Sequence, residues 1–354
     1  MDKNRYSSID FLRFAAAYTV AITHLTINHF QPNLELEIVS SMAVEVFFII
    51  SGFVLAPQII RLATENIFSN YKIFLIRRWY RTIPLYILSL LLTSLILNKF
   101  ITLDLVKYLL FIQNFFHLSV VEDYFSISWS LSVEEWFYII FPLFLIIISF
   151  FFNLKKNNLI IASLFFIILI FLIRFFFANH DDWGSDVRRI VLFRLDSIAF
   201  GFLLYFFKDL IVNNKKNLFK LFILFLIVSL ITFKLFESNI EENLLYLKLI
   251  SHYVIAIWGS SLLIFVYLLD KYIVNKFLIK MNFFLGKISY STYLFHLLLI
   301  YIIGSFNEIN FEFFLVIFTV SQVLISIMLF NIIENPILKS RPNYQKIYKS
   351  SFKE

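Results

Sequence analysis

The chain has 354 residues, of which 60% are hydrophobic and 16% are charged, whereas a soluble globular domain carries about 25% charged residues. This composition excludes an ordinary soluble domain and predicts that most of the chain lies in a lipid bilayer. No cysteine is present, which excludes disulfides, thiolate metal sites and a cysteine nucleophile. The net charge of +7 is spread through short loops, so it indicates membrane topology and no nucleic-acid partner.

Apolar segments recur from one end of the chain to the other. A hydrocarbon core of about 30 Å needs about 20 apolar residues per helix. The sequence therefore predicts an all-α, polytopic membrane protein of about ten transmembrane helices, near residues 9–27, 41–60, 82–98, 126–152, 158–178, 190–207, 218–236, 246–269, 284–304 and 311–333. The segment 105–116 is too short for a span and holds polar residues, which predicts an interfacial or re-entrant helix.

The loop charges give the orientation. Lys and Arg gather on one side of the ten predicted spans and acidic residues on the other, so the positive-inside rule places both termini in the cytoplasm of a bacterium and the chain in its inner membrane. A signal peptide cleaved near Ala43 is the weaker alternative, because another apolar segment follows at once. The inner loop 61–81 and the tail after Pro336 are the sizeable aqueous pieces, so one membrane domain is expected over 1–354.

Ionisable residues inside these spans are candidates for a functional site, because a charge near mid-bilayer costs about 2.5 to 3.5 kcal/mol on insertion scales. They are Arg13, His24, Glu45, Glu134, Glu135, Arg194, Asp196, His296 and Glu334.

Arg13 and His24 share the first span and face the same way, because eleven residues make about three helical turns with ~20° of drift. Arg13 would lie near the cytoplasmic surface and His24 in the outer half of the bilayer. Glu45 enters from the same outer side on the next span and is expected to orient and charge the imidazole of His24. The alternatives are a snorkelling arginine with an interfacial histidine, and a structural buried pair.

Glu134 and Glu135 point about 100° apart on one helix. We expect Glu134 to face a polar interior and Glu135 to lie near the outer interface. Trp129 and Trp136 flank the two carboxylates, and an aromatic belt at the membrane surface is the favoured interpretation of both.

Arg78 and Arg81 lie one turn apart at the predicted inner mouth of the third span. They obey the positive-inside rule, and they also suit the recognition of phosphate groups. Arg194 and Asp196 cannot meet on one helix, so each needs a partner elsewhere. His296 lies near mid-membrane in the ninth span, where a hydrogen-bonded packing residue and a site residue are equally expected.

The order and spacing of these segments resemble the acyltransferase-3 family of ten-helix membrane acyltransferases, which O-acylate bacterial surface polysaccharides and related acceptors. The resemblance runs nearly end to end. It is carried by the Arg-x10-His pattern of Arg13 and His24, by Val44 to Phe53 with Glu45 where the family has Asp, by Arg78-x-x-Arg81 before Pro84, and by Trp129 to Pro142 with Trp136 where Gln is common. Weaker likenesses surround Arg194, His296 and Glu334.

The resemblance implies transfer of an acyl group, usually acetyl, from cytoplasmic acyl-CoA to a hydroxyl of a surface or lipid-linked glycan, with membrane lipid around the chain. Arg78 and Arg81 would hold the CoA phosphates and Arg13 would extend that path. His24, tuned by Glu45, would act as general base or carry the acyl group itself, and the sequence leaves both mechanisms open.

Glu134 joins His24 and Glu45 as a catalytic candidate. Trp129, Arg194, Asp196 and His296 are further candidates, and no residue is assigned to a metal. Some family members carry an esterase-like domain after the membrane unit, and since this chain ends before one, it is expected to work alone or with a partner protein. The alternatives are a transporter or flippase of a lipid-linked sugar and a structural subunit of a glycan-assembly complex.

Overall fold

The computed structural model describes residues 6–30, 34–64, 67–100, 102–153, 155–178, 182–208, 215–237, 245–305 and 310–342. These ranges contain helices and no strand. The longer helices are α1 (Ser7–Phe30), α2 (Leu34–Thr64), α3 (Ile67–Ile96), α5 (Ser128–Ser149), α6 (Lys156–Phe177), α7 (Leu195–Tyr205), α9 (Lys215–Glu237), α10 (Leu245–Leu269), α11 (Lys276–Gly304) and α12 (Phe311–Leu329).

The prediction of an all-α, multi-pass membrane protein is confirmed. Within the described residues, seven helices are long and apolar enough to cross a membrane, in α2, α3, α5, α6, α10, α11 and α12. Every one of the ten predicted ranges overlaps a helix. The count of ten crossings and the cytoplasmic termini stay predictions, because α1, α7 and α9 are outside this group of seven.

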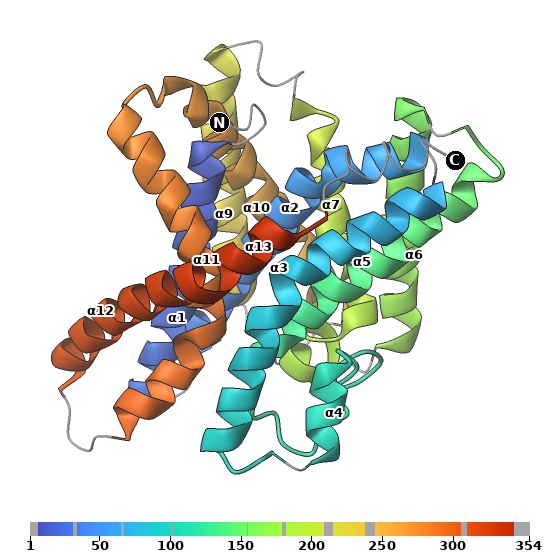
Figure 1. Cartoon of the computed structure of the whole chain (residues 1–354). Coiled ribbons are helices and arrows are strands. Elements are labelled where there is room, and N and C mark those ends of the chain that lie inside the picture. Colours follow the sequence, from blue (N-terminus) through green and yellow to red (C-terminus); the bar gives the residue numbers. More distant parts are fainter. Residues whose placement is uncertain are drawn as a thin grey trace.

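Helix α2 lies at the centre of the bundle and packs against α1, α7, α10, α3 and α5. Figure 1 shows α1, α11 and α12 together on one side and α3, α5 and α6 on the other, with α2 and α7 between them. The contact between α2 and α7 is made by glycines. A Cβ at Gly52 would collide with the carbonyl oxygen of Ile198, and a Cβ at Gly201 with that of Ile49, so the backbones of the two helices touch directly.

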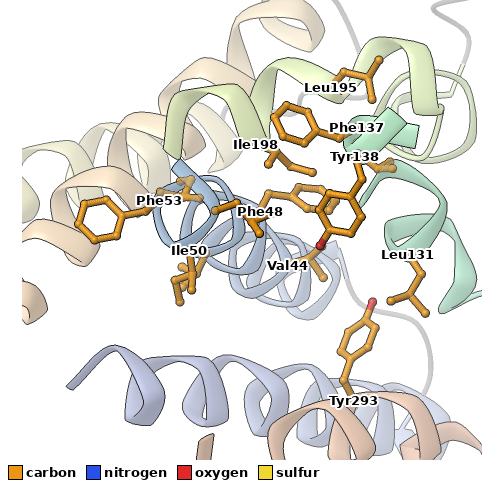
Figure 2. Packing of buried hydrophobic residues seen from close by; sticks show 14 of the residues in the cluster. Val44, Phe48, Ile50, Phe53, Leu131, Phe137, Tyr138, Leu195, Ile198 and Tyr293 are labelled. Atoms are coloured by element: carbon orange, nitrogen blue, oxygen red, sulfur yellow. The ribbon is translucent and has the colours of Figure 1, made fainter. Parts of the chain in front are cut away.

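The buried core surrounds α2. Phe48 and Phe53 of this helix lie among Phe137 on α5 and Ile198 on α7 (Figure 2). Phe48 is 1% exposed and Phe137 is 0% exposed. Because residues this large are shielded from both lipid and water, the core fixes how α5 and α7 lie against α2.

The structure tests the predictions about the regions between spans. The prediction of a loop over 61–81 is wrong, because α2 continues to Thr64 and α3 begins at Ile67, with Pro84 inside α3. Arg77, Arg78 and Arg81 therefore lie within a helix. The short segment before α5 does contain a short helix, α4 (Leu103–Leu109). After α12 the chain continues as η4 (Phe330–Glu334) and α13 (Asn335–Ser340), and the rest of the predicted tail lies outside the described residues.

Candidate active site

A cavity of about 90 Å³ lies between α1, α2, α3, α5 and α11, and it brings together residues that are far apart in sequence. Three guanidinium groups line it, from Arg13 on α1 and from Arg78 and Arg81 on α3. The prediction that the α3 pair shares one helix face is confirmed. The remaining lining includes polar and aromatic residues: Ser51, Thr82, Ser130, Glu134, Tyr138, Ser289, Tyr290 and Tyr293.

The side chain of Glu134 faces this cavity, as expected. Its carboxylate accepts hydrogen bonds from Ser51 Oγ at 2.5 Å and from the hydroxyl of Tyr138 at 3.3 Å. It also interacts electrostatically with Arg81 and Arg13. Glu334 of η4 lies near the same two arginines. The positive charge of the cavity is therefore partly balanced by carboxylates.

The expectation that Glu135 lies near the outer interface is wrong. Its side chain is buried, and its carboxylate accepts a hydrogen bond of 2.6 Å from Thr82 Oγ1 on α3. It also interacts electrostatically with Arg78. Both directions from this turn of α5 lead into protein, because α2 packs on one side of the helix and α3 on the other.

His24 of α1 lies against His296 of α11. His24 Nδ1 is 2.8 Å from His296 Nε2, and the ring centroids are 5.0 Å apart with an angle of 24° between the planes. On its other edge, His24 Nε2 is 3.4 Å from Ser40 Oγ of α2. His296 Nδ1 is 2.6 Å from the carbonyl oxygen of Tyr293. The two histidines thus form a hydrogen-bonded pair that the sequence does not reveal.

The predicted partner of His24 was Glu45, and the structure corrects this. Glu45 is ion-paired with Arg194, and both side chains are buried. Asp196 is ion-paired with Arg174 of α6 at 2.9 Å. The expectation that Arg194 and Asp196 find partners on different helices is therefore confirmed. Glu45 stabilises the start of α7 by this pairing and is not the group that orients the imidazole of His24.

Tyr293 connects the cavity to the histidine pair. Its side chain lines the cavity, and its ring centroid is 5.9 Å from that of His296. Its hydroxyl is 2.6 Å from Ser130 Oγ on α5. Figure 2 shows the ring of Tyr293 reaching from α11 toward Leu131 of α5. Tyr293 is therefore a lining residue of the cavity that also contacts the histidine pair.

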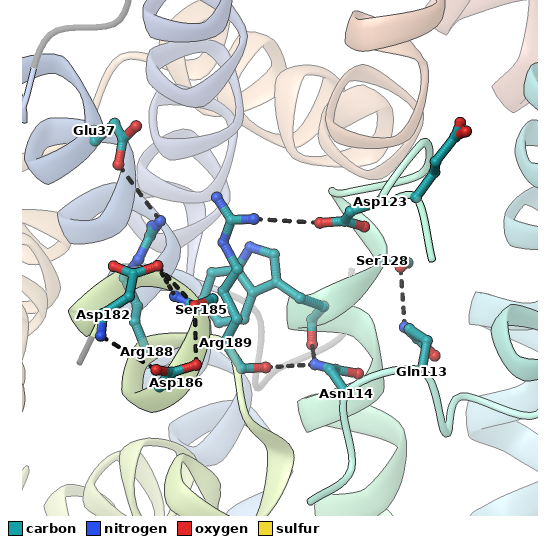
Figure 3. Close-up of polar contacts among 12 residues, drawn as sticks. Glu37, Gln113, Asn114, Asp123, Ser128, Asp182, Ser185, Asp186, Arg188 and Arg189 are labelled. Atoms are coloured by element: carbon teal, nitrogen blue, oxygen red, sulfur yellow. Dashed lines mark hydrogen bonds and ion pairs between the residues drawn. The ribbon is translucent and has the colours of Figure 1, made fainter. Parts of the chain in front are cut away.

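A second polar network surrounds Arg188 and Arg189 (Figure 3), and both arginines interact electrostatically with His24. The guanidinium group of Arg188, in η1 (Trp183–Arg188), lies over the rings of Trp129 at 5.7 Å and Trp183 at 5.3 Å and bonds Ser41. Arg189 is ion-paired with Asp123 at 3.2 Å. Trp129 is 8% exposed, so the aromatic-belt interpretation is wrong for this residue.

The segment before α5 braces this network. Gln113 donates hydrogen bonds to Ser128 Oγ at 3.0 Å and Ser132 Oγ at 2.6 Å. Asn114 donates to the carbonyl oxygens of Trp129 and Arg189. These buried amides thus tie the segment before α5 to the first turn of that helix and to Arg189.

The sequence contained signals for some residues that the prediction omitted. Tyr290 and Tyr293 lie six and three residues before His296, so Tyr293 shares its helix face. Arg188 and Arg189 stand in a predicted outer loop, against the positive-inside pattern, and such an exception indicates a role beyond topology. Ser130 carries no comparable signal.

The chain is similar in sequence to several known proteins. The chain is 26% identical over 334 residues to a Staphylococcus aureus (strain COL) protein named "Putative O-acetyltransferase", covering 86% of this chain and 52% of the relative, and the same values hold for its strain MW2 counterpart. An uncharacterised Haemophilus influenzae protein is 37% identical over 119 residues, covering 29% of this chain and 48% of that protein. The chain thus spans about half the length of these relatives.

No solved structure matches the chain. The acyltransferase-3 family model, described as an acyltransferase domain, matches residues 6–331, a range that holds the cavity, the histidine pair and both buried ion pairs. The chain therefore belongs to the acyltransferase-3 family.

Proposed function

We propose that this protein transfers an acyl group, in the first place acetyl, from acyl-CoA to a hydroxyl of a surface or lipid-linked glycan in the bacterial inner membrane. The family and the names of the Staphylococcus aureus relatives support acyl transfer to oxygen. The observation that carries the proposal is the cavity with three arginines, one lining residue of which, Tyr293, lies beside the His24–His296 pair.

The arginines form the donor end of the site. Coenzyme A carries phosphate groups, and guanidinium groups bind phosphate through paired, charge-assisted hydrogen bonds. Arg78 Nη2 donates to Gln58 Oε1 at 3.0 Å, and Arg81 and Arg13 interact with Glu134. These neighbours hold the three side chains in place before the donor arrives. The cavity is too small for a whole coenzyme, so only the part of the donor next to the arginines would occupy it, and the thioester end would extend toward His24.

His24 forms the chemical end. As a general base, its ring nitrogen would take the proton of the acceptor hydroxyl while the hydroxyl oxygen attacks the thioester carbonyl. The new C–O bond forms, the C–S bond breaks, and the CoA thiolate leaves with the proton that His24 holds. As an acyl carrier, the same nitrogen would attack the thioester carbonyl first and displace the CoA thiolate. The acceptor hydroxyl oxygen would then attack this acyl group, the C–N bond to His24 would break, and the hydroxyl proton would pass to the thiolate. Both routes use one unprotonated nitrogen of His24.

The test is acyl transfer by the purified protein in lipid vesicles. Radiolabelled acetyl-CoA is supplied with lipid-linked sugars, polysaccharide or peptidoglycan fragments, and base-labile label on each glycan is counted. We expect label with the wild type and none with His24→Ala. His29→Ala is the matched control, because His29 is exposed at the end of α1 and packs on Phe311, and it should label normally.

Two results contradict the proposal. If no glycan is labelled by a folded wild-type protein, acyl transfer to glycans is wrong, and movement of lipid-linked sugar across the vesicle would then support the flippase alternative. If His24→Ala labels as well as the wild type, the histidine is not the reacting group.

A further inference from the structure

We infer that His296 is a positioning residue that fixes which nitrogen of His24 reacts, in the place that a carboxylate holds in a serine–histidine–aspartate triad. That His24 reacts rests on the proposed function, whereas the position of its ring proton follows from hydrogen bonds. The order of donors and acceptors can be followed from one end of the pair to the other.

The first step is the backbone contact of His296. A carbonyl oxygen accepts hydrogen bonds and cannot donate one, so the 2.6 Å contact between His296 Nδ1 and the carbonyl oxygen of Tyr293 requires that Nδ1 carry a proton. His296 is 0% exposed and has no carboxylate among its described hydrogen-bond partners. Because an unpaired buried charge is costly, the ring is neutral and its Nε2 has a free lone pair.

The second step passes this order to His24. His296 Nε2 can only accept in the neutral ring, so across the 2.8 Å contact His24 Nδ1 must donate. A neutral His24 therefore has its proton on Nδ1 and its lone pair on Nε2. The opposite tautomer would place two lone pairs against each other.

The third step is the direction of the free lone pair. His24 Nε2 points to the side of α2, where Ser40 Oγ is 3.4 Å away. Ser41, the next residue, bonds the guanidinium group of Arg188. A hydroxyl that replaces Ser40 as partner would thus meet an unprotonated nitrogen with a buried arginine close by. His296 itself touches neither acyl donor nor acceptor in this arrangement.

The packing of α1 against α11 keeps the two histidine rings in this hydrogen-bonded arrangement. Helices α1 and α11 pack along much of their length, and a Cβ at Gly286 would collide with the side chain of Asp10, so the two helices are in close contact near their other ends. Thr292, on the same helix as His296, bonds Ser326 of α12 at 3.0 Å. The ring of His296 is therefore presented from a helix that is fixed on both sides.

The experiment reads the tautomer directly. Protein labelled with ¹⁵N in its histidine rings, in lipid vesicles, is studied by NMR, where protonated and unprotonated ring nitrogens have well-separated shifts. The chain has six histidines, and His24→Ala identifies the signals of His24. We expect a protonated Nδ1 and an unprotonated Nε2 for His24 in the wild type.

Two variants separate position from packing. His296→Leu removes the acceptor and should give a mixture of tautomers at His24, with kcat lowered roughly 100-fold and the KM for acetyl-CoA unchanged. His296→Gln keeps an amide oxygen that can accept from His24 Nδ1 and should retain the wild-type tautomer and most of kcat. His252→Leu, a buried histidine of α10 that stacks on Trp183, is the control and should leave the signals of His24 in place.

A proton on Nε2 of His24 in the wild type would overturn the inference. So would a His296→Leu protein that keeps both the tautomer and kcat. A wild type with the expected tautomer and no acyl transfer would instead overturn the proposed function, so the two failures are distinguishable.

Discussion

Glu45 of α2 and Arg194 at the start of α7 form an ion pair with 1% and 3% of their side chains exposed. Removing one member leaves the other charged and buried without compensation, which costs about 3–5 kcal/mol. We expect Glu45→Leu to lower the thermal stability of the purified protein strongly. The double variant Glu45→Leu with Arg194→Leu should recover part of the loss.

The exposed pair Lys99–Glu122 is the control, with 34% and 61% of the side chains exposed. Breaking an exposed pair costs less than about 1 kcal/mol, so Glu122→Ala should leave the unfolding temperature almost unchanged. Equal losses from the buried and the exposed pair would contradict the assignment of Glu45 to α7.

The glycine contact between α2 and α7 predicts a second stability effect. Gly201→Ala places a methyl group on the carbonyl oxygen of Ile49, and relief requires the helices to separate, which typically costs about 1–3 kcal/mol. Gly304→Ala is the matched control, because the nearest atom to its new methyl group would be 3.8 Å away. Thermal unfolding in detergent should show a large loss for position 201 and little change for position 304.

The arginines of α3 predict a selective kinetic effect. Arg78→Ala combined with Arg81→Ala should raise the KM for acetyl-CoA more than the KM for the glycan, because both side chains line the cavity. Arg77→Ala is the control, since Arg77 donates to the carbonyl oxygen of Pro342 and is not among the lining residues. An unchanged KM for acetyl-CoA in the double variant would show that Arg78 and Arg81 do not bind the donor and serve membrane topology alone.

The adjacent carboxylates of α5 predict opposite outcomes for one substitution. Glu134→Gln removes the charge that faces Arg81 and Arg13 in the cavity, so turnover should fall at least tenfold. Glu135→Gln can still accept the hydrogen bond from Thr82 and should keep most of the activity. Initial rates at saturating acetyl-CoA provide the comparison, and equal loss in both variants would remove the distinction between the two residues.

Much of the fold was predictable because the lipid environment imposes a simple rule. A helix satisfies its own backbone hydrogen bonds, so apolar stretches of sufficient length are read directly as helices. The rule gave the long helices and the short segment before α5. It failed for residues 61–81, where charged side chains suggested an aqueous loop although Arg78 and Arg81 point into a cavity inside the protein.

The sequence predicted many of the residues of the site, but not which of them contact one another across helices. Helical periodicity placed Arg13 and His24 on one face and required separate partners for Arg194 and Asp196, because these are relations within a helix. The partner of His24 depends on which helix packs beside α1, and neither periodicity nor charge reports that. The predicted depth in the membrane favoured Glu45 as the partner of His24. Helix packing instead places His296 Nε2 at 2.8 Å from His24 Nδ1.

Tyr293 stands where the arginine-lined cavity meets the histidine pair, with its hydroxyl on Ser130. The consequence concerns the energy supply of the cell. If the protein lies in a membrane that holds a proton gradient, a file of water from the cavity past the histidine pair would let protons leak, and the ring of Tyr293 lies between the two. Tyr293→Ala is therefore expected to discharge a pH gradient in sealed vesicles, as reported by an entrapped dye, even when no acyl donor is present.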